Sequence, residues 1–117
     1  MVVREQPVLY SVDFSGCTAL RGMTPETITA VFVGALRDAG ATIVETLSHQ
    51  FPDAGLTCAL VLAESHAVLH TWPETGTVNI DIFSCSTRLK SLAAIVELGK
   101  ALGAGNVSVQ EILRADG

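Results

Sequence analysis

The chain has 117 residues, 49% of them hydrophobic, so it can enclose one hydrophobic core but not two, and we expect one domain over residues 1–117. Its net charge of −5 argues against nucleic acid and anionic membranes as partners, and no run approaches the roughly 18 apolar residues that span a bilayer. Three cysteines without a Cys-x-x-Cys pair fit neither a disulfide framework nor a zinc site. The charges near the N-terminus do not fit a secretion signal, so a cytoplasmic location is expected.

The first half of the chain predicts a strand, a helix and two further strands. Residues 7–14 alternate apolar side chains as strands do. Thr24, followed by a proline, is a typical helix start, and apolar residues then recur at helical spacing until Gly40. Residues 41–48 predict a second strand. Residues 56–63 are apolar on both faces except at one threonine, which predicts a strand inside the sheet.

The second half predicts a hairpin, a helix and a last strand. Residues 66–72 and 77–84 are extended segments joined by a short turn, which favours antiparallel pairing. Ser86 or Thr87 is expected to cap a second helix that runs to Leu102 and ends at a glycine-rich break. The residues after that break, 106–113, alternate as a final strand.

This order of elements predicts the fold class. A strand, a helix, several strands, a helix and a strand around one small core indicate an α+β two-layer sandwich, with helices on one face of a largely antiparallel sheet. The other face of such a sheet needs a cover, which a second copy of the chain can supply. We therefore expect a homodimer with active sites near the subunit boundary.

Candidate catalytic groups concentrate in one stretch of the chain. The run Glu64-Ser65-His66 is followed by His70-Thr71-Trp72-Pro73-Glu74 and then by Cys85. Each of these residues alone has a more ordinary interpretation, such as a serine at a strand end, a surface histidine or a small buried thiol. Their occurrence together marks the place where chemistry is expected.

This stretch resembles the core motif of the prokaryotic S-adenosylmethionine decarboxylase proenzymes, and similarity extends over nearly the whole chain. Members of that family make a pyruvoyl cofactor by cutting their own chain before a serine. The resemblance implies autocatalytic serinolysis between Glu64 and Ser65, which gives a β chain of residues 1–64 and an α chain of residues 65–117. It also implies decarboxylation of S-adenosylmethionine to the aminopropyl donor for spermidine and other polyamines.

The family's processing and catalytic roles map onto four residues. Ser65 is the pyruvoyl precursor, through which the substrate amine is held as a Schiff base. His70 is the processing base, because an imidazole exchanges protons near neutral pH. Cys85 is the proton donor in turnover, and Thr57 supports processing.

The resemblance also implies the contacts made with the substrate. Phe51, in a His-x-Phe segment, corresponds to the residue that stacks on adenine, and Glu74 to the residue that holds the ribose hydroxyls. An aromatic face suits a purine or a sulfonium, and a carboxylate can accept from two hydroxyls. His70 is expected to line the same site.

The required chemistry agrees with a pyruvoyl group. Decarboxylation at an amino-acid Cα needs a covalent electron sink, and pyridoxal phosphate would need a lysine and a phosphate cradle. The only lysines, Lys90 and Lys100, lie on the predicted second helix. A metal site at His66, His70 and Glu74 is not expected, because this spacing suits a helix and the segment is extended.

One geometric condition follows from the spacing of the predicted catalytic residues. Ser65 and His70 are an odd number of residues apart, so a regular strand places them on opposite faces of the sheet. If they cooperate, the chain must bulge or turn near the cleavage site, where strain would also favour the acyl shift.

Several positions depart from the family pattern. The motif histidines are separated by Ala67-Val68-Leu69, threonines stand at 75 and 77, a polar Asn79 replaces a small apolar residue, and Ser86 follows the motif cysteine. These changes leave a first alternative, a pyruvoyl-dependent decarboxylase of a smaller amino acid such as arginine or ornithine. A second alternative is an unprocessed, non-catalytic homologue that binds or regulates a partner.

Overall fold

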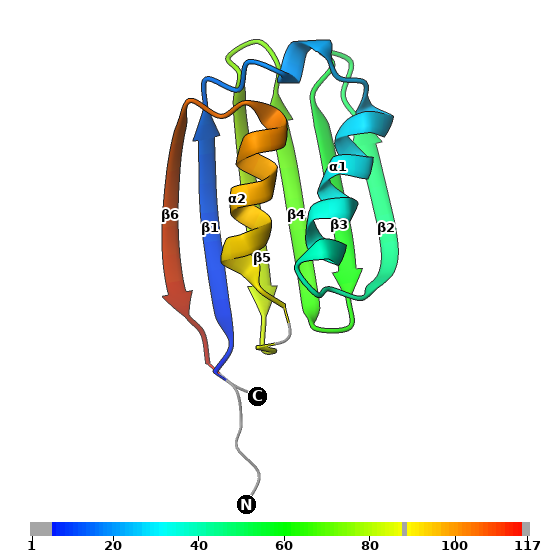
Figure 1. Cartoon of the computed structure of the whole chain (residues 1–117). Coiled ribbons are helices and arrows are strands. Elements are labelled where there is room, and N and C mark those ends of the chain that lie inside the picture. Colours follow the sequence, from blue (N-terminus) through cyan, green and yellow to red (C-terminus); the bar gives the residue numbers. More distant parts are fainter. Residues whose placement is uncertain (1–5, 88, 116–117) are drawn as a thin grey trace, which may run out of the picture.

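The structure is a computed structural model and describes residues 6–87 and 89–115. The elements in chain order are β1 (Val8–Ser15), a 3-10 helix η1 (Leu20–Gly22), α1 (Pro25–Asp38), β2 (Ile43–Gln50), β3 (Leu56–Leu62), β4 (Ser65–Trp72), β5 (Thr77–Ser84), α2 (Ser91–Leu102) and β6 (Asn106–Leu113). The strands form one sheet in the order β2-β3-β4-β5-β1-β6, and every neighbouring pair is antiparallel. Both helices lie on the same face of this sheet (Figure 1). The predicted α+β two-layer sandwich is confirmed.

The core lies between the helices and one face of the sheet. Alternate residues of β3, β4 and β5 are buried there, as the period of a strand requires. Both helices face the sheet with one apolar side, formed by Ile28, Phe32, Leu36, Ile95, Leu98 and Leu102. Neither helix in the described part of the chain is long and apolar enough to cross a bilayer.

The two helix starts differ in how well the sequence predicts them. Thr24 caps α1 as predicted, because its hydroxyl accepts from the backbone N–H of Thr27 at 3.1 Å. The predicted cap of α2 at Ser86 or Thr87 is wrong, since α2 begins at Ser91. The Ser84 hydroxyl accepts from the Ser86 N–H at 3.0 Å and donates to its carbonyl at 3.2 Å. These bonds hold a turn after β5 in place of a first helical turn.

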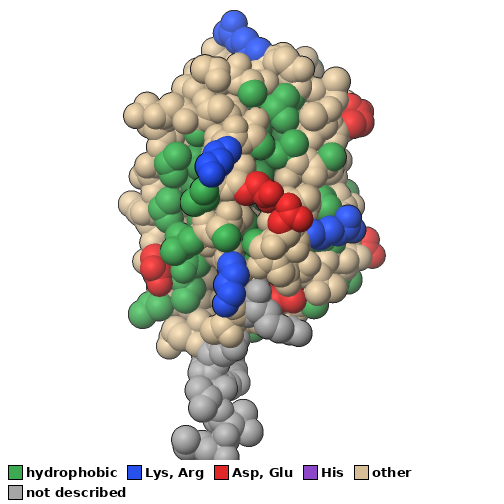
Figure 2. Space-filling model, in the orientation of Figure 1, with side chains coloured by type: hydrophobic (Ala, Val, Ile, Leu, Met, Phe, Trp, Pro, Cys, Tyr) green, Lys and Arg blue, Asp and Glu red, His purple; other side chains and the backbone are tan. Residues whose placement is uncertain are grey.

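The opposite face of the sheet is covered by no element among residues 6–87 and 89–115. Figure 2, which views the helix-covered face, shows none of the three histidine side chains. His66, His70 and Trp72 alternate with the buried residues of β4 and so lie on the open face. Leu47 and Val61 are 72% and 50% exposed on the neighbouring strands of this face. We call this surface the open face.

Gly103 is the position at which a small substitution has the clearest expected effect on stability. It ends α2 with φ +67°, and a Cβ there would contact the Thr18 hydroxyl. Gly103→Ala should therefore lower the free energy of unfolding by about 1–3 kcal/mol. Gly34→Ala is the matched control, because the space beside this helical glycine is open and alanine favours a helix by up to about 1 kcal/mol.

Urea denaturation of both variants measures this difference. It is best done in a Ser65→Ala background, in which the chain is expected to stay in one piece. Equal stability of Gly103→Ala and the parent chain would show that the end of α2 adapts to a side chain at this position.

Candidate active site

A small cavity lies on the open side of the end of β4. Its volume is about 140 Å³, and three of the predicted site residues, Phe51, His70 and Glu74, line it together with Trp72. We call it the β4 cavity. The structure thus brings together three residues that span 24 positions of the sequence, one from the turn after β2 and two from β4 and the turn that follows it.

His70 is held in place at the centre of this group. Its Nδ1 lies 2.6 Å from the Thr57 hydroxyl, and the two residues are directly opposite each other in the pairing of β3 with β4. The His70 ring meets Phe51 at 5.7 Å and Trp72 at 4.6 Å between ring centroids, both nearly edge to face. These contacts fix the ring plane of the imidazole and leave the other ring nitrogen, Nε2, as the atom that can exchange a proton with a ligand.

The turn between β2 and β3 places Phe51 beside β4. The Phe51 N–H donates to the Gly55 carbonyl at 2.7 Å, and the Asp53 carboxylate accepts from the Gly55 N–H at 3.1 Å. A Cβ on Gly55 would lie 3.3 Å from the backbone oxygen of Thr71, so a side chain at this position would crowd β4. The glycine therefore lets the turn approach β4 closely enough for Phe51 to reach His70.

A second group of predicted residues lies at the other end of β4. The Glu64 carbonyl accepts from the backbone N–H of Cys85 at 3.4 Å and lies 3.6 Å from its Sγ. The Glu64 side chain is only 3% exposed, and its Oε1 accepts from the Thr42 N–H at 2.9 Å. Ser65 has φ +155°, in a region where residues other than glycine are strained, and its Oγ lies 3.3 Å from Nδ1 of His66. We call this group the cleavage cluster.

The cleavage cluster has the parts that an acyl shift requires. A hydroxyl lies next to the carbonyl of the preceding residue, and two donors of Cys85 point at the oxygen on which negative charge would develop. The strain at Ser65 would be relieved if the peptide bond before it were broken. The imidazole that the structure places at the Ser65 hydroxyl is that of His66, not that of His70.

Ser65 and His70 do not meet within one copy of the chain. A turn at residues 63–64 directly precedes Ser65, but β4 then pairs with β3 and β5 in continuous register up to its end. The bulge considered for this strand is therefore absent from the described β4, and the sheet's register shift lies in β2, between Ile43 and Glu45. Ladders on both sides keep β4 regular, so the two residues lie on opposite faces and about 16 Å apart along the strand.

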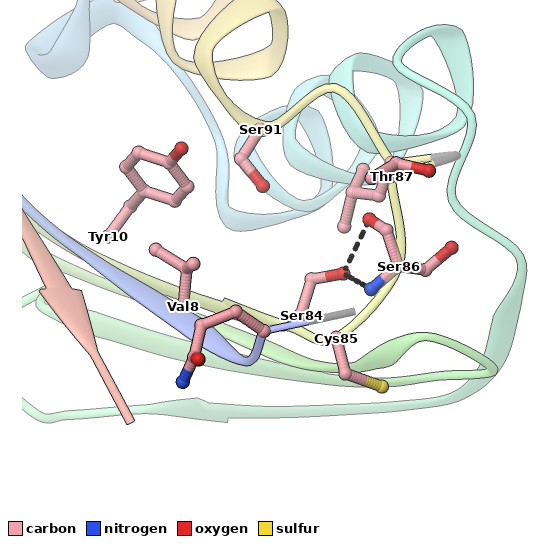
Figure 3. A pocket seen from close by; sticks show the side chains of 9 residues that line it. Val8, Tyr10, Ser84, Cys85, Ser86, Thr87 and Ser91 are labelled. Atoms are coloured by element: carbon pink, nitrogen blue, oxygen red, sulfur yellow. Dashed lines mark hydrogen bonds between the residues drawn. The ribbon is translucent and has the colours of Figure 1, made fainter. Parts of the chain in front are cut away.

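A larger cavity of about 450 Å³ lies behind the cleavage cluster, on the helix side (Figure 3). Its wall is rich in hydroxyl groups, among them those of Tyr10, Ser84 and Ser91. Burial, together with the negative charge of Glu111, raises the pKa of Tyr10. Cys85 also lines this cavity, and its side chain points away from Tyr10 and Ser84 (Figure 3).

Known proteins with similar sequences belong to one family. A family model described as S-adenosylmethionine decarboxylase matches residues 9–115. The chain belongs to the S-adenosylmethionine decarboxylase family. The S-adenosylmethionine decarboxylase proenzyme of Acidithiobacillus ferrooxidans is 36% identical over 102 residues, which cover 87% of this chain and 77% of the relative. The proenzyme of Clostridium tetani is 32% identical over 102 residues, covering 87% and 81% of the two chains.

A solved structure shows the same fold in this family. The crystal structure of the adenosylmethionine decarboxylase from Aquifex aeolicus matches with a TM-score of 0.85 and 26% sequence identity, over 97% of this chain and 94% of that one. The family resemblance carried by the Glu-Ser-His and His-Thr-Trp-Pro-Glu motifs is thereby confirmed.

The three cysteines of this member of the S-adenosylmethionine decarboxylase family differ in access to solvent. Cys17 and Cys58 are buried and Cys85 is exposed, and burial raises the pKa of Cys17. We expect a thiol reagent such as dithionitrobenzoate to react quickly with one thiol per folded chain, because the thiolate is the reactive form and must be reached by the reagent. Cys85→Ser should remove that fast reaction, and denaturant should expose the two buried thiols.

Peptide mapping after alkylation identifies the modified residue. Cys58→Ser is the matched control, and it should leave the fast reaction intact. Fast labelling of Cys17 or Cys58 in the folded chain would contradict this assignment.

Three residues of this family member's open face were given no role in the sequence analysis. Trp72 lines the β4 cavity, and Asn79 and Asp13 are bonded to it in a row across the sheet. The alternation of β4 gave a usable signal for Trp72, since it lies two residues beyond His70 and so on the same face.

No group of three histidine, cysteine or acidic residues in the described part of the chain is arranged to hold a metal ion.

Proposed function

We propose that this chain is a self-processing, pyruvoyl-dependent decarboxylase of S-adenosylmethionine that supplies the aminopropyl donor for polyamine synthesis. Membership of the family supports the reaction and the substrate. The observation that carries the proposal is the geometry of the link between Glu64 and Ser65, where a strained serine follows a carbonyl that two donors of Cys85 approach.

The proposed processing begins with the Ser65 hydroxyl. Its Oγ attacks the carbonyl carbon of Glu64, the C–N bond breaks, and the peptide becomes an ester with a free amine on residue 65. A base removes the Cα proton of that residue, and elimination then releases Glu64 as a carboxylate and leaves dehydroalanine. Tautomerisation and hydrolysis release ammonia and leave a pyruvoyl group on the α chain, residues 65–117, beside the β chain, residues 1–64.

The residues around this link fit such a group. The N–H and Sγ of Cys85 are placed to stabilise negative charge on the Glu64 oxygen during the acyl shift. The buried Glu64 side chain, bonded to the Thr42 N–H, would keep the new chain end in place after cleavage. A pyruvoyl group at residue 65 would supply the electron-withdrawing carbonyl that decarboxylation at an amino-acid Cα requires.

In turnover we assign the proton delivered to the substrate carbon to Sγ of Cys85, the exposed thiol beside residue 65. The β4 cavity would take the nucleoside end of the substrate. Phe51 presents an aromatic face for adenine, and the Glu74 carboxylate accepts hydrogen bonds from the ribose hydroxyls. Thr57 holds His70 at the edge of this site.

A homodimer would complete the active site. Within one copy, the β4 cavity and the cleavage cluster lie at opposite ends of β4, and the open face exposes Leu47, Val61 and Trp72. If two open faces pack about a two-fold axis with the β4 strands antiparallel, the start of β4 in one copy lies over its end in the other. Ser65 begins β4, and its Oγ lies 3.3 Å from Nδ1 of His66 on the open face, so the hydroxyl can be reached from that face. Each site would then take Ser65 and Cys85 from one copy and His70 from its partner.

Assays of carbon dioxide release test the proposed reaction. Purified protein should release labelled carbon dioxide from carboxyl-labelled S-adenosylmethionine, and not from arginine or ornithine. Borohydride in the presence of substrate should attach a substrate-derived mass to the α chain and abolish activity. Release from arginine or ornithine alone would make the chain a decarboxylase of a smaller amino acid. An uncut chain that releases nothing from any of the three would make it a non-catalytic homologue.

A further inference from the structure

A hydrogen-bonded row crosses the open face beside the β4 cavity. The indole Nε1–H of Trp72 donates to Oδ1 of Asn79 at 2.7 Å, and Nδ2 of Asn79 donates to Oδ1 of Asp13 at 2.7 Å. The three residues come from β4, β5 and β1, which are neighbours in the sheet. Asn79 pairs directly with His70 on one side and with Asp13 on the other, so the row is built into the strand register.

The direction of both bonds follows from the chemistry of the groups. An indole N–H can only donate and an ionised carboxylate can only accept, so the amide between them must present its oxygen to Trp72 and its nitrogen to Asp13. This settles the orientation of the Asn79 amide, which is otherwise ambiguous. Asn79 is one of the polar departures from the family pattern, and its pairing with Asp13 gives it a structural partner.

The row changes what the Trp72 ring can do. Bonds in a chain polarise one another, so the charge on Asp13 strengthens the Asn79 oxygen as an acceptor. Withdrawal of the indole proton toward that oxygen raises the electron density of the ring, and the face of an electron-rich ring attracts cations. The bond also fixes the ring at 4.6 Å from His70, in the wall of the β4 cavity.

We propose that Asn79 and Asp13 are a positioning pair, which holds Trp72 and tunes its ring to bind the cationic sulfonium of the substrate. This inference rests on the proposed function, since it assigns the source of selectivity for a sulfonium nucleoside at the same site. The pair acts through Trp72 and touches no reacting atom, so it should set substrate affinity and leave the chemical step nearly unchanged.

Two nucleosides that cannot be turned over test the proposal by calorimetry. The probes are 5′-methylthioadenosine, a neutral thioether, and its S-methyl derivative, a sulfonium cation of nearly the same shape. Wild-type protein should bind the sulfonium more tightly than the thioether. Asp13→Asn, which keeps a possible hydrogen bond but removes the charge, should lower that preference by about threefold to tenfold, and Asn79→Leu by at least as much.

Exchanging the side chains at positions 13 and 79 should restore the preference for the sulfonium probe. In Asp13→Asn combined with Asn79→Asp, the carboxylate at 79 can accept from Trp72 and the amide at 13 can donate to it, so the sulfonium preference should return. Asn79→Asp alone places two carboxylates together and should bind both probes less well. Asp81→Asn, which removes a carboxylate from the same strand and the same face, is the control and should behave as wild type.

Kinetics and spectroscopy separate this role from general damage. With S-adenosylmethionine, Asp13→Asn and Asn79→Leu should raise KM by about the same factor while kcat changes less than twofold. The chain contains one tryptophan, so its indole N–H gives a single NMR signal, which should move upfield when the acceptor is lost. If Asn79→Leu fails to fold, the proposal is tested with Asp13→Asn and with the double variant in which the two side chains are exchanged.

The outcomes distinguish this inference from the proposed function. Wild-type protein that neither decarboxylates S-adenosylmethionine nor binds the sulfonium probe would overturn both. Wild-type protein that does both, with Asp13→Asn and Asn79→Leu showing an unchanged sulfonium preference, would overturn the role of the pair alone. An unshifted indole signal in Asn79→Leu would show that the hydrogen bond does not exist in solution.

Discussion

Ser65→Ala is expected to abolish cleavage, so that mass spectrometry finds one intact chain of 12.3 kDa in place of two fragments. The methyl group of alanine cannot attack the Glu64 carbonyl, and no ester can form. The Cys85 donors and the strain at residue 65 remain in place, yet neither can break the peptide without a nucleophile. Decarboxylation should fall to the level of a blank, because the carbonyl group is never made.

Two further variants make this result specific. Ser108→Ala, on exposed β6, removes a serine hydroxyl far from the cleavage cluster and should be cut as in wild type. Ser65→Gly should also stay uncut, but it should be more stable than Ser65→Ala by about 1 kcal/mol, since glycine adopts φ +155° without strain. Cleavage of Ser65→Ala at the same bond would refute the serine mechanism, and equal stability of the two variants would refute the strain.

The fold was predictable because its signals are local. Alternating burial in β3, β4 and β5 and the threonine cap of α1 are each encoded within a few neighbouring residues. The start of α2 was not predictable, because the Ser84 hydroxyl is engaged by the backbone of Ser86 and because Lys90 bonds across to the Ala39 carbonyl at the end of α1. A capping motif in the sequence cannot show that the backbone at Ser86 is held in a turn by the Ser84 side chain.

The candidate site was predictable in its residues more than in its arrangement. The motif indicated Phe51, His70 and Glu74, and the structure places all three at one cavity. The partners of Asn79 depend on which strands are neighbours, and β1 enters the sheet beside β5 although more than sixty residues separate Asp13 from Asn79. The distance between Ser65 and His70 likewise depends on β4 remaining regular, which its pairing on both sides decides.

Mixed dimers of Ser65→Ala and His70→Ala chains are expected to regain activity that neither variant has alone. In the proposed dimer, the His70→Ala copy contributes an intact Ser65 and Cys85, and the Ser65→Ala copy contributes an intact His70 to the same site. The His70→Ala chain should therefore be cut in the mixed dimer and uncut by itself. Because one of the two composite sites is intact, activity per dimer should reach about half that of wild type.

The experiment requires co-expression with two different affinity tags, so that sequential purification isolates only mixed dimers. The matched control pairs Ser65→Ala with Cys85→Ala. Both residues belong to the cleavage cluster, so each composite site in that dimer carries one defect and activity should stay absent. If each site were contained in a single copy, neither pairing would restore activity, and the separation of Ser65 from His70 would have to close by rearrangement of β4. Restoration in the first pairing alone shows that the open faces of two copies build the site between them.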